Sequence, residues 1–343
     1  MSGAVEATVT EVAATGGVLL EVDDLISHYP VPRGLLGAMM RRPQLTVKAV
    51  DGVTFSVAAG EMVALVGESG CGKTTTAQTV IRMVANQGGS IRFNGAEIGE
   101  LSPGALRPLR REIQIIYQDP YESLDPRFTV RDTIEEPIRV HSLVPRKEDR
   151  EAKVHEAMER AGLTPPELFI DRYPHELSGG QRQRVAIAAA LVLEPKLLIA
   201  DEPVSMLDVS VRAQILNLFK DLQTKFGISI IFITHDLRVA RYLCHRIGVM
   251  YFGKLVEIAP VEELFTAPKH PYTKALLGTV GVEGESLDGA QVAGEAFNPA
   301  ADTTGCRYYA RCPMRVDRCK TAHPPMETIK SGHDIACYEW RRS

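Results

Sequence analysis

A glycine-rich run near residue 70 carries the clearest chemical information in this sequence. The run fits the pattern G-x-x-x-x-G-K-[ST] and reads Gly67-Glu68-Ser69-Gly70-Cys71-Gly72-Lys73-Thr74-Thr75. Glycines at these positions let the backbone curl its N–H groups around phosphates, and the helix that follows presents its positive end to them. Lys73 adds positive charge, and the Thr74 hydroxyl offers a ligand for Mg2+. The pattern predicts a phosphate-binding loop, or P-loop.

The flanking sequence supports this reading over an ordinary glycine turn. An apolar, strand-like run, Met62–Val66, precedes the loop, and the helix-like run Thr74–Val84 follows it. Strand before and helix after is the context in which the motif binds phosphate.

A pair of carboxylates ends another apolar run. Leu197–Ala200 is followed by Asp201 and Glu202. A carboxylate at the end of the strand can hold the Mg2+ shell, and the next one can face the terminal phosphate and accept a proton from attacking water. Alone the pair is weak evidence, because solvated carboxylates commonly end strands.

A third run settles the subclass of P-loop protein. Leu177-Ser178-Gly179-Gly180-Gln181 ends twenty residues before Asp201 and resembles the signature of the ATP-binding-cassette (ABC) family, which reads LSGGQ. The resemblance covers about residues 19–268. It implies an α/β P-loop NTPase cassette with a RecA-like core, an antiparallel β subdomain and a helical subdomain at about 119–177. It also implies a head-to-tail dimer, in which Ser178 and nearby N–H groups face the γ-phosphate on the partner's P-loop.

Companion residues occur in the order of that family. Gln118 matches the Q-loop, Ser205-Met206-Leu207-Asp208 the D-loop, and His235 the switch histidine, while Tyr29 is the candidate for adenine stacking. In isolation His235 is typical of a strand-end histidine and Tyr29 of a packing aromatic, so both roles depend on the resemblance. Met206 stands where the family usually has a small residue, a departure that removes no reacting group.

The resemblance thus implies three sets of site residues. The catalytic set is Glu202, His235, Gln118 and Lys73. The Mg2+ set is Thr74, Gln118 and Asp201. The set that binds ATP is Tyr29, Gly67, Ser69, Gly70, Cys71, Gly72, Lys73, Thr74, Thr75, Gln118, Ser178, Gly179, Gly180, Gln181 and Asp208.

Two further segments narrow the family. His270-Pro271-Tyr272-Thr273-Lys274-Ala275-Leu276 resembles the motif that follows the cassette in oligopeptide and dipeptide importers. The stretch Asp119–Pro126, after Gln118, is similar to the same importers, whose Q-loop region receives a coupling helix from the membrane subunit. A generic proline-containing loop is the alternative for this stretch.

Four of the six cysteines fall within the last 38 residues. Cys306, Cys312, Cys319 and Cys337 form the pattern C-x5-C-x6-C-x17-C. Disulfides are rare in a reducing cytoplasm, whereas four thiolates suit a metal or iron–sulfur site. The spacing lacks the C-x2-C pairs common in zinc sites, and the importer family has a tail of this type that can hold a [4Fe–4S] cluster. Zinc, free thiols or a disulfide remain alternatives.

Basic residues surround the first three of these cysteines. They are Arg307, Arg311, Arg315, Arg318 and Lys320. Positive charge there would offset the negative charge of a four-thiolate cluster, although solvated arginines around a bare loop give the same pattern. Cys71 and Cys244 stand apart from the four.

The elements that must position these residues alternate between strands and helices. Strand-like runs occupy Leu19–Val22, Val53–Val57, Met62–Val66, Ile91–Asn94, Ile113–Ile116, Leu197–Ala200, Ile228–Ile233 and Ile247–Tyr251. Val211–Leu222 has one apolar face, as a helix packed on a sheet does. Such alternation predicts an α/β fold with a mostly parallel core. Residues 119–176 read instead as helices with proline turns, including Glu151–Gly162.

Both ends of the chain read as less regular. Residues 1–18 lack a basic start and an apolar core, so we expect a flexible tail rather than a signal peptide. Ala275–Cys306 contains no Lys or Arg but several acidic residues among Gly and Ala, which predicts a flexible acidic linker within a C-terminal region, 269–343. Pro30–Leu45 mixes arginines with Leu and Met and favours a surface hairpin over a membrane or partner contact.

Composition restricts the class of partner. The 343 residues carry a net charge of −4 and a pI of about 6.2, which disfavours nucleic acid as a partner. The longest apolar stretch, Val185–Ala200, is interrupted by Glu194-Pro195-Lys196 and falls short of the ~20 apolar residues of a spanning helix. We therefore expect a cytoplasmic chain, held at the cytoplasmic face of the membrane by permease subunits.

Together these observations predict the ATPase subunit of a binding-protein-dependent importer, with di- or oligopeptides favoured. Its expected partners are a second cassette, either a copy or a paralogue, two membrane permease subunits and, indirectly, a solute-binding protein. The expected cofactors are ATP, Mg2+ and a [4Fe–4S] cluster. The alternatives are import of another solute such as a sugar or nickel, a cassette acting on nucleic acid or ribosomes, and one serving iron–sulfur assembly.

Overall fold

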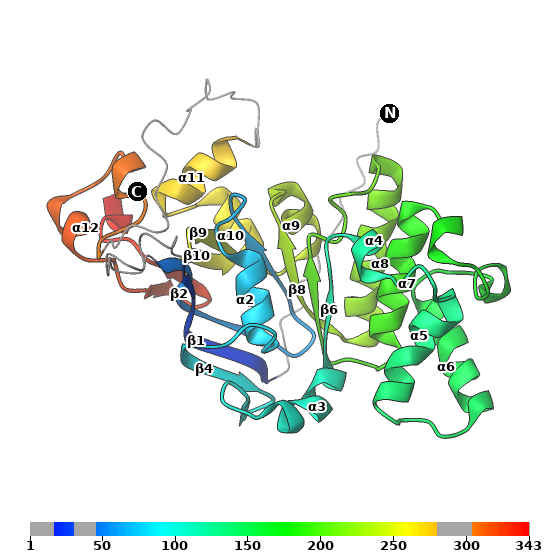
Figure 1. Cartoon of the computed structure of the whole chain (residues 1–343). Coiled ribbons are helices and arrows are strands. Elements are labelled where there is room, and N and C mark those ends of the chain that lie inside the picture. Colours follow the sequence, from blue (N-terminus) through cyan, green and yellow to red (C-terminus); the bar gives the residue numbers. More distant parts are fainter. Residues whose placement is uncertain (1–16, 31–45, 280–303, 343) are drawn as a thin grey trace, which may run out of the picture.

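The computed structural model describes residues 17–30, 46–279 and 304–342 (Figure 1). Residues 1–16 of the predicted tail, most of Pro30–Leu45 and most of the acidic linker lie outside the described residues. No helix in the described ranges is long and apolar enough to cross a bilayer.

An eight-stranded sheet forms the centre of the described part, in the order β11-β12-β10-β9-β3-β8-β7-β6. Its parallel strands are β3 (Met62–Val66), β6 (Ile113–Ile116), β7 (Leu197–Asp201), β8 (Ser229–Thr234) and β9 (Arg246–Tyr251). Every residue of β3, β7 and β8 is buried, which explains why they read as unbroken apolar runs. The prediction of a mostly parallel core is confirmed.

A second, antiparallel sheet packs beside the first. Its order is β2-β1-β4-β5, with bounds Thr46–Ala58, Val18–Pro30, Gly88–Phe93 and Ala96–Glu97. The helix α2 (Lys73–Val80) contacts both this sheet and β7, and α3 (Pro103–Glu112) packs against β6. Apolar residues of β1, β2, β4 and α2 share one core with Val63 and Leu65 of β3. This sheet is the antiparallel subdomain that the family resemblance implied.

The predicted helix Thr74–Val84 ends earlier than expected, at Val80. Arg82 has φ +59°, a left-handed conformation that an α-helix cannot contain. The chain then turns towards β4.

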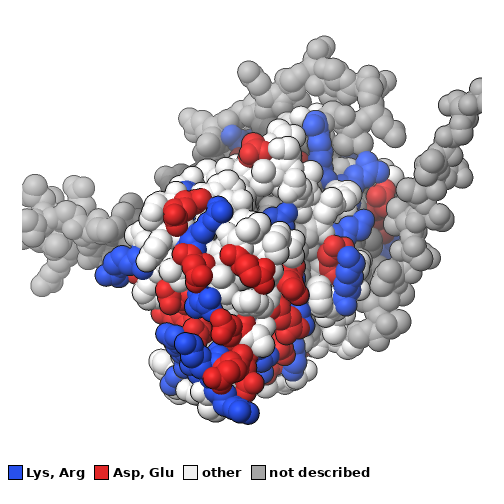
Figure 2. Space-filling view, turned by 90° about the vertical axis from the view of Figure 1, so that its right-hand side faces the viewer, with Lys and Arg blue, Asp and Glu red and all other residues white. Residues whose placement is uncertain are grey.

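Helices gather on the side of the molecule opposite the C-terminus (Figure 1). They are α4 (Pro120–Ser123), α5 (Val130–Val140), α6 (Lys147–Arg160) and α7 (Gly179–Leu191), with 3-10 turns at Pro166–Leu168 and Pro174–Glu176. Thr129 and Asp132 form a capping box at the start of α5, which stabilises that helix by about 1 kcal/mol. Figure 2 shows acidic and basic side chains interspersed over this face, without a single-sign patch.

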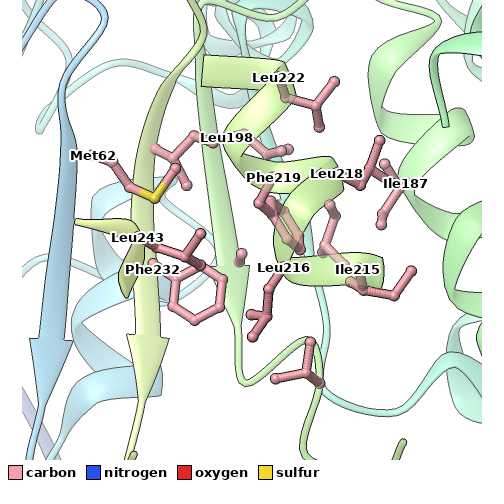
Figure 3. Packing of buried hydrophobic residues seen from close by; sticks show 14 of the residues in the cluster. Met62, Ile187, Leu198, Ile215, Leu216, Leu218, Phe219, Leu222, Phe232 and Leu243 are labelled. Carbon is pink, nitrogen blue, oxygen red and sulfur yellow. The ribbon is translucent and has the colours of Figure 1, made fainter. Parts of the chain in front are cut away.

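The long helix α8 (Val209–Phe226) covers one face of the main sheet (Figure 3). Ile215, Leu216, Phe219 and Leu222, the apolar face expected from the sequence, are at most 8% exposed. Phe219 meets Phe232 of β8 edge-on, with ring centroids 5.5 Å apart. Burial of a side chain of this size contributes about 2–3 kcal/mol. Helix α9 (Leu237–Leu243) packs on the same face.

The C-terminal region extends the main sheet. After β10 (Lys254–Pro260), α10 (Val261–Thr266) and α11 (Pro271–Gly278) comes the part we call the C-terminal lobe, residues 304–342. The lobe contains Tyr309–Arg311 (3-10), α12 (Asp317–Thr321), β11 (Glu327–Lys330), β12 (His333–Ile335) and Trp340–Arg342 (3-10). Because β12 pairs with β10, the lobe is built into the sheet.

A buried histidine fastens this hairpin to the sheet. His333 is 0% exposed, and its two ring nitrogens lie 2.9 Å from Glu257 Oε1 and 3.1 Å from Glu263 Oε1. Burial by itself would lower the pKa of His333, but the bonds to both carboxylates outweigh it and raise that pKa. Burial would raise the pKa of Glu257, yet hydrogen bonds from His333 and from the backbone amides of Lys269 and His270 lower it.

We predict that His333→Gln loosens the β11–β12 hairpin more at about pH 6 than at about pH 9. The pKa of His333 is raised in the folded protein above its usual value of 6.5. The stabilisation from this residue is therefore fully present below pH 6.5 and is lost as the pH rises through the raised pKa. Because the pKa of Glu257 is lowered from 4.5, this residue is ionised at both pH values of the experiment. At the lower pH the expected loss is about 3 kcal/mol, measured by hydrogen exchange of the β12 amides.

The matched control is Lys330→Gln, because Lys330 contacts Glu263 from a position that is 69% exposed. It should cost less than about 1 kcal/mol at either pH. An equal loss for His333→Gln at both pH values would contradict a protonated, paired His333.

Candidate ATP-binding and hydrolysis site

The parallel strands bring the predicted site residues to one edge of the sheet. The P-loop follows β3, Gln118 follows β6, Asp201 ends β7 and His235 follows β8. In open α/β sheets ligands bind beyond the carboxyl ends of the strands, where neighbouring connections diverge. Strand order thus places Gln118, Asp201 and His235 on the same side of the sheet as the P-loop.

Two glycines of the P-loop lie where a side chain does not fit. Gly67 has φ +154°, and a Cβ there would overlap the carbonyl oxygen of Met250. Gly72 has φ +106°, and a Cβ there would overlap the carbonyl oxygen of Ala49. The loop backbone is therefore pressed between β9 and β2.

Lys73 lies inside the curve of this loop. Its side chain is nearly buried, and Nζ donates hydrogen bonds to the carbonyl oxygens of Gly67, at 2.9 Å, and Glu68, at 3.1 Å. The ammonium is thus held at the concave side of the loop, where phosphate charge would be neutralised. Gly72 precedes α2, so the positive end of that helix faces the same space.

Two oxygens suited to Mg2+ meet beside the P-loop. Thr74 Oγ1 donates a hydrogen bond to Asp201 Oδ1 at 3.1 Å, and burial raises the pKa of Asp201. Gln118 and Asp201 line the same pocket. Mg2+ is commonly bound by one or two protein oxygens together with phosphates and waters, so this set fits the ion.

The predicted base and the switch histidine are brought together. His235 Nδ1 lies 3.1 Å from Glu202 Oε2. Glu202 has φ +46°, unusual for a residue with a side chain, and its amide donates to the carbonyl oxygen of Ile233 at 3.0 Å. Backbone strain of this kind persists where surrounding structure holds it and is frequent at functional sites.

The signature residues begin helix α7. Ser178 Oγ accepts a hydrogen bond from the Gln181 amide at 3.3 Å, and Gln181 Oε1 accepts one from the Ser178 amide at 2.9 Å. A Cβ on Gly180 would overlap Val211, so this glycine allows α7 to approach α8. Within the described parts of this chain, no hydrogen bond joins the signature to the P-loop.

The D-loop leads into α8. Asp208 caps that helix, with Oδ1 accepting the Val211 amide at 3.0 Å. Met206 and Val209 beside it are 62% and 81% exposed. Tyr29, the candidate for adenine stacking, lies opposite Val47 near the end of β1 and is 39% exposed. Its role stays a prediction.

The four C-terminal cysteines line one small pocket. They come from four short segments of the lobe, and all are free thiols. Burial raises the pKa of Cys306 to about 12 and that of Cys337 to about 11, and the other cysteines of the pocket act in the same direction. Among the described residues, however, no three His, Cys, Asp or Glu side chains lie close enough to hold a metal ion. A single-ion site is therefore not preformed.

The basic residues near these cysteines have other partners. Arg307 donates to the carbonyl oxygen of Phe252 and pairs with Asp51. Arg311 approaches Glu68 of the P-loop, with Nη1 3.8 Å from Oε2. Arg318 stacks on the ring of Tyr338 at 4.0 Å. Arg307 and Arg311, which were expected to offset cluster charge, instead contact residues of the cassette.

Sequence reasoning also missed a contact between Tyr272 and the P-loop. Tyr272 Oη accepts a hydrogen bond from the Glu68 amide at 3.2 Å. Tyr272 belongs to the run His270–Leu276, which signalled a family but gave no hint of where the ring lies. The contact spans 204 residues of sequence, and no local pattern encodes such a pairing.

We predict that Gly72→Ala lowers ATP affinity at least about tenfold, because it adds both left-handed strain and an overlap with the Ala49 carbonyl. Titration with a fluorescent ATP analogue measures it. Gly95→Ala is the matched control. Gly95 likewise has a positive φ, +79°, but an added Cβ there would meet no atom of the described residues within 4 Å, its chain neighbours aside. The control should keep wild-type affinity, and a tolerated Gly72→Ala would show that the loop is less confined than described.

Comparison with known proteins places the chain in a family. Residues 50–205 match the family described as ABC transporter, and residues 256–319 match the oligopeptide/dipeptide transporter, C-terminal region. The chain is 44% identical over 331 residues to the oligopeptide transport ATP-binding protein AppF of Bacillus subtilis, covering 95% of this chain and 98% of that protein. It is 52% identical over 267 residues to the glutathione import ATP-binding protein GsiA of Escherichia coli, covering 78% of this chain and 42% of that protein.

Solved structures agree with this assignment. A dimeric ATP-binding cassette in a post-hydrolysis state with ADP and phosphate aligns with TM-score 0.61 and 26% identity, over 71% of this chain and 99% of that one. CbiO1 of Clostridium perfringens, part of an ABC transporter complex, aligns with TM-score 0.61 and 29% identity, over 73% and 91%. The chain belongs to the ABC transporter family, as an ATP-hydrolysing cassette that carries the C-terminal region of oligopeptide/dipeptide transporters.

Proposed function

We propose that this cassette powers a binding-protein-dependent importer of di- and oligopeptides. The observation that carries the proposal is the continuous match to an oligopeptide transport ATP-binding protein across both the cassette and the C-terminal region. The relative named for glutathione import is consistent with small peptides as the solute class. Import of another solute is the alternative.

The proposed chemistry is in-line attack of water on the γ-phosphate. Lys73 and the P-loop amides neutralise the phosphates, and Mg2+ is held through Thr74, Asp201 and Gln118. Glu202 accepts the proton of the attacking water, because its carboxylate follows the strand end that bears Asp201. His235, 3.1 Å from Glu202, orients that carboxylate and the γ-phosphate. Tyr29 stacks on the adenine.

A second cassette, either a copy or a paralogue, completes each site in this proposal. Ser178 is exposed at the start of α7, and Met206 and Val209 lie exposed beside the D-loop, so both elements are open to a partner. Asp208 and the signature residues 178–181 then approach the nucleotide on the partner's P-loop. Closure and reopening of the dimer drive two membrane permease subunits, which hold the cassette at the cytoplasmic face of the membrane.

The C-terminal lobe is proposed to hold a [4Fe–4S] cluster within a region that spans 269–343, after a cassette at 19–268. The support is the donor set: four free thiols line one pocket. Four thiolates are a ligand set of [4Fe–4S] clusters, and their spacing in the sequence lacks the C-x2-C pairs common in zinc sites. Their raised pKa values keep Cys306 and Cys337 protonated until a metal displaces the proton.

We predict that the chain, reconstituted in liposomes with its permease subunits and binding protein, hydrolyses ATP faster when di- or tripeptides are added than when maltose or nickel is added. Coupling requires that the solute-loaded binding protein favours dimer closure. Stimulation by maltose or nickel alone would refute the peptide assignment.

We predict that Glu202→Gln keeps ATP binding but lowers turnover at least about 100-fold, because the amide preserves shape and removes the base. Near-normal turnover of this variant would refute the role of Glu202 as the base.

We predict that anaerobically purified protein contains about four irons and four sulfides per chain, and that Cys337→Ser loses most of both, because one thiolate ligand is removed. Iron and sulfide analysis with the visible spectrum measures the change. Cys244→Ala, altered at a buried cysteine outside the lobe, should retain full content. Zinc in place of iron, or iron unchanged by Cys337→Ser, would contradict the cluster.

A further inference from the structure

Three tyrosine rings connect the C-terminal lobe to the cassette core. Tyr251 ends β9, Tyr272 lies in α11, and Tyr308 lies in the lobe between Cys306 and Cys312. Their ring centroids are 4.6 Å apart for Tyr251–Tyr272, 5.2 Å for Tyr251–Tyr308 and 5.5 Å for Tyr272–Tyr308. Each residue is at most 3% exposed. The rings therefore form one rigid, dry contact.

Tyr272 directs its hydroxyl at the P-loop. Its oxygen accepts the hydrogen bond of the Glu68 amide at 3.2 Å, while the Glu68 carbonyl accepts one from Lys73 Nζ at 3.1 Å. Both backbone polar groups of Glu68 are thus held: the amide by Tyr272 of α11 and the carbonyl by Lys73. The orientation of this residue decides how the following amides enter the curve of the loop.

The lobe braces the loop at two further places. Arg311, from the segment that ends in Cys312, lies 3.8 Å from the Glu68 carboxylate. Arg307 donates to the carbonyl oxygen of Phe252, and the amide of the next residue, Gly253, donates to the Cys71 carbonyl of the P-loop at 2.6 Å. One contact lies near the start of the loop and the other near its end.

We propose that Tyr272 is a positioning residue of the ATP site, through which the packing of the C-terminal lobe sets the geometry of the P-loop. The ring is held by Tyr251 and Tyr308, and the hydroxyl transmits its position to Glu68. Nucleotide affinity therefore depends on the lobe through the P-loop backbone.

The test compares Tyr272→Phe with Tyr308→Phe in the full chain. Tyr272→Phe keeps the ring and removes only the oxygen that accepts the Glu68 amide. It should weaken binding of ATP and of ADP about fivefold, the worth of one neutral hydrogen bond, while turnover at saturating ATP changes less than about twofold. Hydrogen exchange of the P-loop segment containing Glu68 should become faster. Tyr308→Phe, whose hydroxyl makes no hydrogen bond to the P-loop residues described, should leave affinity and exchange unchanged.

Other results would overturn the proposal. A lower melting temperature of Tyr272→Phe with unchanged affinity would show a merely structural role for the hydroxyl. Equal losses of affinity in both variants would show that packing, not the hydrogen bond, matters. Should Tyr272→Phe fold poorly, Arg311→Gln tests the same link from the lobe: it should weaken ATP binding about twofold, since its pair with Glu68 is partly exposed. Wild-type affinity in Arg311→Gln would then refute the link.

Discussion

The confinement of the P-loop backbone is the constraint on which the rest of the structure depends. Gly67 lies against the Met250 carbonyl and Gly72 against the Ala49 carbonyl, so the loop passes between a strand of the main sheet and a strand of the antiparallel sheet. Neither sheet can shift without moving the loop. Close packing of this kind transmits small displacements, because protein interiors are dense and hardly compressible.

The same geometry gathers the reacting groups at one edge of the main sheet. Parallel strands end at one edge, so a threonine of α2 meets the aspartate that ends β7, and a glutamate next to it meets the histidine that follows β8. The short distances between these side chains are consequences of strand order. Burial disfavours the charged form of Asp201 and so raises its pKa, and a neighbouring cation would offset that penalty.

The C-terminal lobe is more closely joined to the cassette than an appendage would be. β12 extends the main sheet, His333 is buried between two carboxylates, and Arg307 reaches the turn after β9. None of these contacts involves the cysteines. The packing of Tyr308 against Tyr251 and Tyr272 adds to this attachment. A group bound in the cysteine pocket would therefore act on a fold already in contact with the P-loop.

The sequence alone determined the features that local patterns encode. The P-loop, the apolar strands β3 and β6 and the apolar face of α8 follow from spacing and periodicity, because each depends on neighbouring residues. It missed the strand β10 and the hairpin β11–β12. The hairpin's short, mixed-polarity strands become strands only by pairing with a sheet edge.

Only the tertiary structure decided how distant segments meet. The bond of Tyr272 to Glu68 joins residues 204 positions apart, and the partners of Arg307 and Arg311 lie far from them in sequence. From composition, these arginines were expected to balance thiolate charge. An arginine takes the partner that the folded chain brings within reach, and that choice is made by the packing of whole elements, which no local pattern records.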